Sequence, residues 1–165
     1  MLDNPKLFKY DATVIAIEDH IMTITLDRPE KKNAINEMMA NEIIYALKYA
    51  AENNQIRVVI IQANGDTFCA GGDLKGMTGT EQLSSSTVPS LGDVEDISLL
   101  LRNLNKPVIT KIQGNVFAGA LMIVANSTHA ISSDDVRFAA PEIKRGIWPF
   151  MVMAGLFRVM PKRQG

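Results

Sequence analysis

Apolar residues along this chain follow two patterns. Short runs rich in β-branched residues are typical of strands that cross a sheet, and they occur at residues 13–17, 21–26, 57–62, 108–112 and 130–132. Longer segments in which apolar residues recur at helical spacing occur at residues 36–53, 94–104, 117–125 and 151–160. Because the order strand, strand, helix recurs, we predict an α/β fold with sheet walls and crossover helices.

Local signals refine this prediction. Glu18-Asp19-His20 separates the first two runs, which predicts an N-terminal hairpin. Asn36 is a suitable cap for the first helix. Residues 117–125 are apolar on every side, which predicts a helix buried in the core. Residues 77–92 are rich in Ser, Thr and Gly, and we expect a loop there.

Two glycine turns follow two of the predicted strands. Gly71 and Gly72 allow successive backbone N–H groups to converge on one point, and Asp73 can cap the turn that follows. Gly114 opens the second turn, and Gly119 lies in the first turn of the predicted helix, where N–H groups lack intrahelical partners. The turns either simply join strand to helix or each supply one N–H to the same oxygen, as in an oxyanion hole.

Composition narrows the function classes. The 165 residues are 47% hydrophobic and 21% charged, which indicates one globular domain. The net charge of −1, without a Lys/Arg block, argues against nucleic acid as the main ligand. Cys69 is the single cysteine, and no Cys/His cluster has metal-site spacing. We find no signal segment and no apolar run long enough to span a membrane, so we expect a cytoplasmic protein.

Four ordered motifs together resemble one family. They are LDRPEKKNAI from Leu26, TFCAGGDLK from Thr67, KPVITKIQGNVFAGA from Lys106 and FAAPEIKRGI from Phe138. Their order and spacing resemble the crotonase, or enoyl-CoA hydratase/isomerase, superfamily from about Thr13 onward. The resemblance implies a crotonase-like spiral of β-β-α units, a single acyl-CoA-binding core over residues 1–165 that ends before the usual C-terminal helices. With those helices present, it implies a homotrimer or hexamer.

The same resemblance implies the ligand and its contacts. The partner is an acyl-CoA thioester, so coenzyme A belongs to the substrate and no separate cofactor or metal is expected. The thioester carbonyl oxygen is expected to bind the N–H groups of Gly72 and Gly119. The other implied contacts are the adenine at Lys32, Asn33 and Ala34, and the pantetheine along Gly72, Asp73, Leu74 and Lys75.

The reaction depends on carboxylates near the thioester. Glu142 matches one of the two catalytic glutamates of the family, whereas the position of the other holds Met122. Hydration uses one group to activate water and a second to help deliver the proton, but moving a double bond from the 3 to the 2 position needs one base. The single glutamate therefore favours 3-enoyl-CoA to 2-enoyl-CoA isomerisation, with 2-enoyl-CoA hydration as the alternative. We expect Met122 and the bulky Trp148 to line the acyl pocket.

Other functions are weaker hypotheses. A non-catalytic acyl-CoA-binding protein would keep the thioester site without its chemistry. RNA binding needs a basic helix, and residues 36–53 carry three glutamates against one lysine. No Ser, His and Asp fall together as a hydrolase triad. We expect Cys69 to be a small core residue, and His20 and His129 to have structural or solvent-facing roles.

Overall fold

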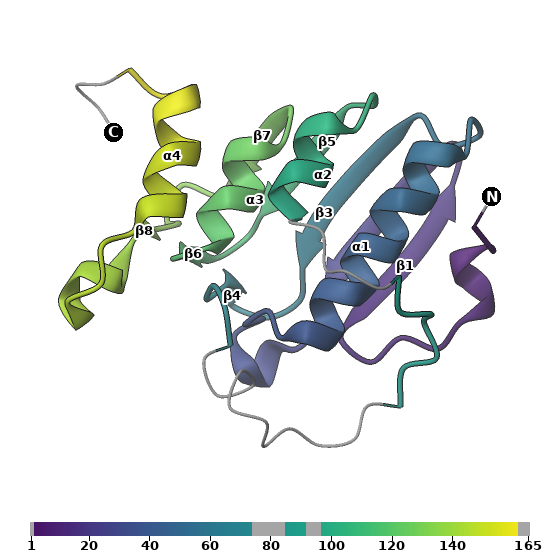
Figure 1. Ribbon diagram of the computed structural model, residues 1–165, viewed down its shortest axis with the longest axis horizontal. Coiled ribbons are helices and arrows are strands. Elements are labelled where there is room, and N and C mark those ends of the chain that lie inside the picture. Colours follow the sequence, from purple (N-terminus) through teal and green to yellow (C-terminus); the bar gives the residue numbers. More distant parts are fainter. Residues whose placement is uncertain (1, 74–84, 92–96, 162–165) are drawn as a thin grey trace.

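The computed structural model describes residues 2–73, 85–91 and 97–161, and these residues form successive β-β-α units (Figure 1). The predicted binding residues Leu74 and Lys75, and most of the loop expected at 77–92, lie outside the described residues. The units run β1 (Thr13–Glu18), β2 (Ile21–Leu26), α1 (Glu37–Glu52); β3 (Val58–Ala63), β4 (Thr67–Cys69), α2 (Ile97–Asn103); β5 (Val108–Ile112), β6 (Asn115–Phe117), α3 (Ala120–Asn126); and β7 (His129–Ser132), β8 (Phe138–Ala139), α4 (Phe150–Val159).

The strands form two sheets. The larger sheet has the order β1-β2-β3-β5-β7, with β1 and β2 antiparallel and the later pairs parallel. The smaller sheet has the order β4-β6-β8 and is parallel throughout. From the second unit onward, the first strand of each unit therefore joins the larger sheet and the second strand joins the smaller one. This arrangement confirms the predicted α/β spiral.

The N-terminal hairpin and the first helix form where the sequence predicts them. Strands β1 and β2 pair from Thr13 opposite Leu26 to Glu18 opposite Ile21. Helix α1 starts after Asn36, whose side chain accepts a hydrogen bond of 2.9 Å from the Met39 N–H. The buried face of α1 packs against β1 and β2, so the amphipathic spacing of this segment places the helix on the sheet.

The four α-helices of the described chain are consecutive neighbours. In Figure 1 they follow one another from α1 to α4 across the molecule, and α1 contacts α2, α2 contacts α3, and α3 contacts α4. The buried hydrophobic cluster draws on both sheets, for example on Ile61 of β3, Phe68 of β4 and Val116 of β6. Residues of α3 are buried or half-buried, as the apolar character of this segment predicts.

Two short strands correct the sequence analysis. No strand was predicted at residues 67–69, and a helix was predicted from residue 117, but residues 67–69 form β4 and residues 115–117 form β6. Helix α3 begins at Ala120, so Gly119 is its N-cap rather than a residue of its first turn. The physical reason is pairing between distant segments, because β6 forms parallel ladders with β4 on one side and with β8 on the other.

Candidate active site

The three strands of the smaller sheet end at one edge. In the parallel register Cys69 of β4 lies beside Val116 of β6, and Phe117 of β6 lies beside Ala139 of β8. Gly72, Gly119 and Glu142 each follow the last residue of one of these strands by two or three positions. In open α/β sheets, ligands bind outside the carboxyl ends of parallel strands. The fold thus brings the three residues singled out from the sequence to one sheet edge.

The two glycine turns touch each other. Gly71 has φ +92°, and a Cβ added to it would lie 2.7 Å from the Ala118 Cβ and 3.2 Å from the Gly119 nitrogen. Ala118 itself has a positive φ of 54°. Its N–H donates to the Ala139 carbonyl oxygen at 2.9 Å, which ties this turn to the end of β8. Only a residue without a side chain at position 71 allows this approach.

The backbone N–H groups of Gly72 and Gly119 have no hydrogen-bond acceptor within residues 2–73, 85–91 and 97–161. By contrast, the neighbouring Asp73 N–H donates to the Ile35 carbonyl oxygen at 2.8 Å. A Cβ added to Gly119 would meet nothing within 4 Å, so space is open beside this residue. Donors that the protein leaves unused are available to an oxygen atom of a ligand.

The turn that carries Gly72 is held by the segment between β2 and α1. The Ile35 N–H donates to the Gly71 carbonyl oxygen at 2.8 Å, and Ile35 and Gly72 form a parallel bridge. The Arg28 guanidinium forms an ion pair with Asp73, with Nη1 3.3 Å from Oδ2, and Nη1 also donates to the Ala34 carbonyl oxygen at 2.8 Å. Both side chains of this ion pair are largely buried. Asp73 therefore positions the Gly72 turn, and Arg28 is a positioning residue that the sequence analysis did not single out.

Asn33 is part of the same framework. Its side chain is 0% exposed, its Oδ1 accepts from the Arg28 N–H, and its Nδ2 donates to the carbonyl oxygens of Asn64 and Thr67, each at 2.8 Å. Its backbone has a positive φ of 51°. All of these contacts are internal, so at this predicted adenine-binding turn the exposed side chain is that of Lys32.

Glu142 lies in a 3-10 helix, η4 (Pro141–Arg145), directly after β8. The residue is half-buried, and its Oε2 atom is buried without a hydrogen-bond partner among the described residues. A buried carboxylate oxygen without a donor is costly, and its occurrence in a folded protein calls for an explanation. A proton acceptor that waits for a substrate is one such explanation.

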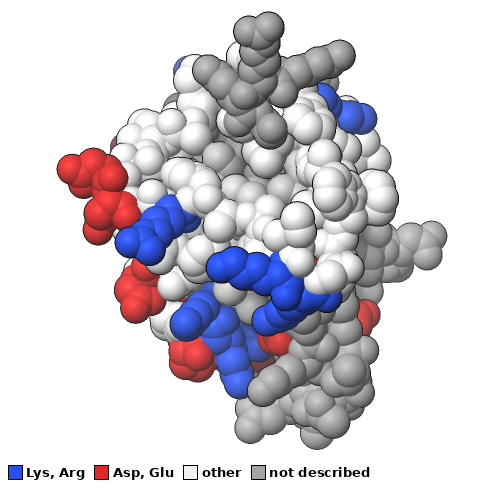
Figure 2. All heavy atoms as spheres, turned by 90° about the vertical axis from the view of Figure 1, so that its left-hand side faces the viewer, with Lys and Arg blue, Asp and Glu red and all other residues white. Residues whose placement is uncertain are grey.

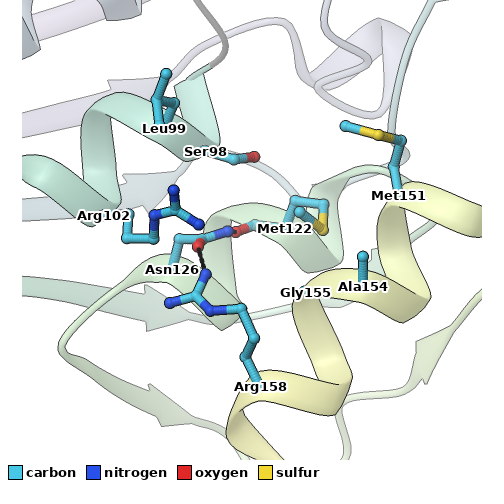
Figure 3. Close-up of a pocket in the computed structure, with 9 residues that line it drawn as sticks. All are labelled: Ser98, Leu99, Arg102, Met122, Asn126, Met151, Ala154, Gly155 and Arg158. Carbon is cyan, nitrogen blue, oxygen red and sulfur yellow. Dashed lines mark hydrogen bonds between the residues drawn. The ribbon is translucent and has the colours of Figure 1, made fainter.

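Met122 lines a cavity whose lining does not include Trp148. Met122 lies on α3 and faces a cavity of about 250 Å³ that α2 and α4 also line (Figure 3). Trp148 is 52% exposed and is absent from the lining of this cavity. Its ring packs against Phe150 with the ring centroids 6.4 Å apart. The structure therefore gives Trp148 a surface position beside the start of α4.

Basic side chains gather on one face. Figure 2 views the side of the molecule that carries α4 and η4, where Lys and Arg side chains group below a broad uncharged surface, with Asp and Glu side chains next to them. Exposed cations of the described chain in the 3-10 segments next to the candidate site include Lys31 of η2 (Pro29–Lys31), Lys32 that follows it, and Lys144 and Arg145 of η4. Such cations suit the phosphates of a nucleotide-containing ligand.

The remaining candidate residues have structural environments. Burial raises the pKa of the Cys69 thiol to about 11, and its Sγ atom donates to the Asn33 carbonyl oxygen at 3.0 Å. His20 lies in the turn between β1 and β2 with Nδ1 2.8 Å from the Gln55 carbonyl oxygen, and His129 is exposed at the start of β7. In the described part of the chain, no group of three or more His, Cys, Asp or Glu side chains is arranged for a metal ion. None of the helices described is long and apolar enough to cross a membrane.

Comparison with known proteins places the chain in one family. The sequence profile of the family "Enoyl-CoA hydratase/isomerase" matches residues 16–165. The chain is 28% identical over 146 residues to the rat "Enoyl-CoA hydratase domain-containing protein 3, mitochondrial", a match that covers 88% of this chain and 48% of the relative. It is 31% identical over 137 residues to the "Trans-2-decenoyl-[acyl-carrier-protein] isomerase" of Streptococcus mutans, covering 81% of this chain and 51% of that protein.

The solved structures agree with the sequence matches. An enoyl-CoA hydratase from Mycobacterium smegmatis superposes with a TM-score of 0.80 and 28% sequence identity, over 93% of this chain and 60% of that chain. The chain spans about half the length of the curated relatives it matches. The profile match, the parallel strand edge and the shared fold lead to one assignment: this chain belongs to the enoyl-CoA hydratase/isomerase family and has the crotonase fold.

Proposed function

We propose that this chain binds acyl-CoA thioesters and moves a proton next to the thioester. The Gly72 and Gly119 N–H groups would bind the thioester oxygen, and Glu142 would carry the proton. The single observation that carries this proposal is the common strand edge, where two N–H groups without acceptors and a buried carboxylate oxygen without a donor follow β4, β6 and β8. A thioester with an acidic C–H beside its carbonyl group needs both: N–H donors that bind the carbonyl oxygen and a carboxylate that takes the proton.

The chemistry follows from these roles. Removal of a proton from C2 of the thioester turns its carbonyl oxygen into an enolate oxygen, where negative charge develops. Two N–H groups aimed at that oxygen stabilise the charge, and each such donor is worth about 3 kcal/mol of activation free energy. The interlocked turns at Gly71 and Ala118 hold the segments that carry these two donors, so little reorganisation is needed during the reaction.

We propose isomerisation as the main reaction. Glu142 would take a proton from C2 of a 3-enoyl-CoA and return it at C4, while the double bond moves from the 3 to the 2 position. This sequence leaves the carboxylate as it began, so one base is sufficient. Met122 stands at the position where the resemblance implies the second glutamate of hydratases, and a thioether cannot carry a proton at neutral pH. Hydration of 2-enoyl-CoA remains the alternative because the rat relative is named a hydratase-domain protein.

Coenzyme A would supply the remaining contacts as part of the substrate, and we propose no separate cofactor. Lys32 offers an exposed cation beside the Gly72 turn, and Lys144 and Arg145 offer further cations in η4. The homotrimer or hexamer implied by the resemblance stays a prediction. So does the cytoplasmic location, since the rat relative is named as mitochondrial.

The test compares two reactions on two glutamate variants. Isomerisation of a 3-enoyl-CoA and hydration of the matching 2-enoyl-CoA are assayed side by side with the wild type, Glu142→Gln and Glu18→Gln. We expect isomerisation by the wild type to exceed hydration. Glu142→Gln should lower isomerisation roughly a thousandfold, because it removes the proton carrier. Glu18 is an exposed residue at the end of β1 and provides the matched control.

Three outcomes contradict parts of this proposal. Activity that survives Glu142→Gln would rule out the proton carrier, and faster hydration than isomerisation would favour the alternative reaction. Tight CoA-ester binding with no exchange of the C2 protons in deuterated water would identify a non-catalytic binding protein. Each outcome comes from a separate measurement on the same purified chain.

A further inference from the structure

The cavity beside Met122 carries charge that the proposed reaction does not use. It has a volume of about 250 Å³ and lies between α2, α3 and α4, with Met122 and Met151 on one side (Figure 3). Arg102 of α2 and Arg158 of α4 also line it, together with Asn126 of α3. Among the residues that the structure describes, no acidic side chain contributes to this lining. The cavity is thus apolar on one side and cationic on the other.

Arg158 is held in place by α3. Its Nη1 donates to the Asn126 Oδ1 at 2.8 Å, and the Asn126 Nδ2 donates to the Met122 carbonyl oxygen at 2.8 Å (Figure 3). Asn126 is only 9% exposed, so this link is partly shielded from water. Gly155 lets α4 approach closely, because a Cβ there would lie 2.5 Å from the Met122 Sδ atom. The guanidinium of Arg158 is therefore oriented before any ligand arrives.

Arg102 reaches the same cavity from the opposite helix. Among the residues that the structure describes, neither Arg102 nor Arg158 forms an ion pair. Both arginines are exposed, so water screens their mutual repulsion, but no acid of the described chain offsets their charge in this cavity. An anion bound between them would supply that missing charge. A guanidinium presents its N–H groups in a planar fork that matches a carboxylate in two-point hydrogen bonding. The cationic side of this cavity therefore suits an acyl chain that ends in a carboxylate better than one that ends in a methyl group.

The cavity is aligned with the proposed reacting centre along α3. Gly119, Met122 and Asn126 are spaced by three and four residues, so they lie on one face of this helical segment. At 1.5 Å per residue, Asn126 lies about 10 Å from Gly119 along the axis. An acyl chain that starts at the Gly119 N–H and passes Met122 therefore ends near the two arginines.

We propose that the Arg102–Arg158 cavity selects acyl thioesters whose far end carries a carboxylate. This inference rests on the proposed function, since it takes Gly119 as the site of the thioester oxygen. It names the substrate class for that site: a medium-length acyl chain with the thioester at one end and a carboxylate at the other. A phosphate of coenzyme A has similar chemistry, so the test compares ligands that share the same coenzyme A.

The test measures binding of two saturated thioesters of equal chain length, suberyl-CoA and octanoyl-CoA, by isothermal titration calorimetry. They differ only in the carboxylate at the far end. The wild type should bind suberyl-CoA about tenfold more tightly, as one charge-assisted pairing predicts. Arg102→Gln and Arg158→Gln should each reduce this ratio about threefold, and the double variant should bring it near one. Arg57→Gln, an exposed arginine before β3, is the matched control and should keep the ratio.

The possible failures are distinct. Equal binding of both thioesters by the wild type, or a ratio that survives the double substitution, overturns this inference and leaves the proposed function intact. If neither thioester binds, the acyl-CoA site itself is wrong. Loss of the ratio in Arg57→Gln as well would show that general surface charge sets the preference, which also overturns the inference.

Discussion

Two glutamates with buried carboxylate oxygens differ in their hydrogen-bond partners. The Glu42 side chain on α1 is 0% exposed, and its carboxylate accepts hydrogen bonds from the Asp11 N–H at 2.8 Å and from the Ala12 N–H and the Thr13 hydroxyl at 3.0 Å each. The Oε2 atom of Glu142 is buried without a partner in the described structure. A satisfied carboxylate stabilises the fold, whereas an unsatisfied one is available for chemistry.

Because the buried Glu42 carboxylate accepts three hydrogen bonds, we expect even a small change of this side chain to destabilise the fold. Glu42→Gln replaces one acceptor oxygen by an amide NH₂ group, which would then face a donor. We expect a loss of about 2 kcal/mol in the free energy of unfolding, measured by urea denaturation. Glu37→Gln, at the exposed start of the same helix, should cost less than about 1 kcal/mol. Similar losses for the two variants would contradict the structural role of Glu42.

Hydrogen-bond and ion-pair partners that lie far apart in the chain could not be predicted from the sequence. Helical spacing correctly placed Glu42 within the first helix, but its partners lie just before β1 and at the first residue of β1, which no local pattern reveals. Asn33 was predicted to contact a ligand because of its motif, and the structure shows its amide bonded to protein groups. Nothing in the sequence distinguished Arg28 from the other residues of the same motif. Its partner Asp73 is 45 residues away in the chain, so the ion pair is visible only in the fold.

At the scale of elements, the short strands were the hardest to predict. Strands β4 and β6 have three residues each, too few to show an alternating pattern. They exist because each pairs with a segment far along the chain. The longer hairpin strands and α1 carry their own periodicity, and there the predicted and observed elements agree. The candidate site was found from the sequence through the motifs that resemble a family, and the sheet edge that unites its residues came from the structure.

Contact between the two glycine turns predicts the effect of a Cβ at Gly71. We expect Gly71→Ala to destabilise the protein by about 2 kcal/mol or more, because it combines a positive φ with a 2.7 Å approach to the Ala118 Cβ. Gly146 has a positive φ of 71° but no atom within 4 Å of an added Cβ, so Gly146→Ala carries only the conformational cost, about 1 kcal/mol. Urea denaturation of both variants measures the difference. Equal losses would contradict the tight approach of the two turns.

At the scale of the whole molecule, the β-β-α rhythm explains how distant motifs meet. Each later unit adds one strand to each sheet, so the ends of β4, β6 and β8 fall in successive positions along one edge. Residues 72, 119 and 142 are far apart in sequence, yet each follows a strand of the same parallel ladder. The same winding sets α2, α3 and α4 side by side, which creates the cavity beyond Met122.

The central claim is that one thioester oxygen binds both glycine N–H groups beside Glu142. A crystal structure of the protein with an acyl-CoA bound tests this claim most directly. The account predicts the thioester oxygen about 3 Å from both the Gly72 and Gly119 nitrogens, with the Glu142 carboxylate facing C2. A thioester oxygen bound to neither nitrogen, or a Glu142 carboxylate turned away from the acyl chain, would contradict it.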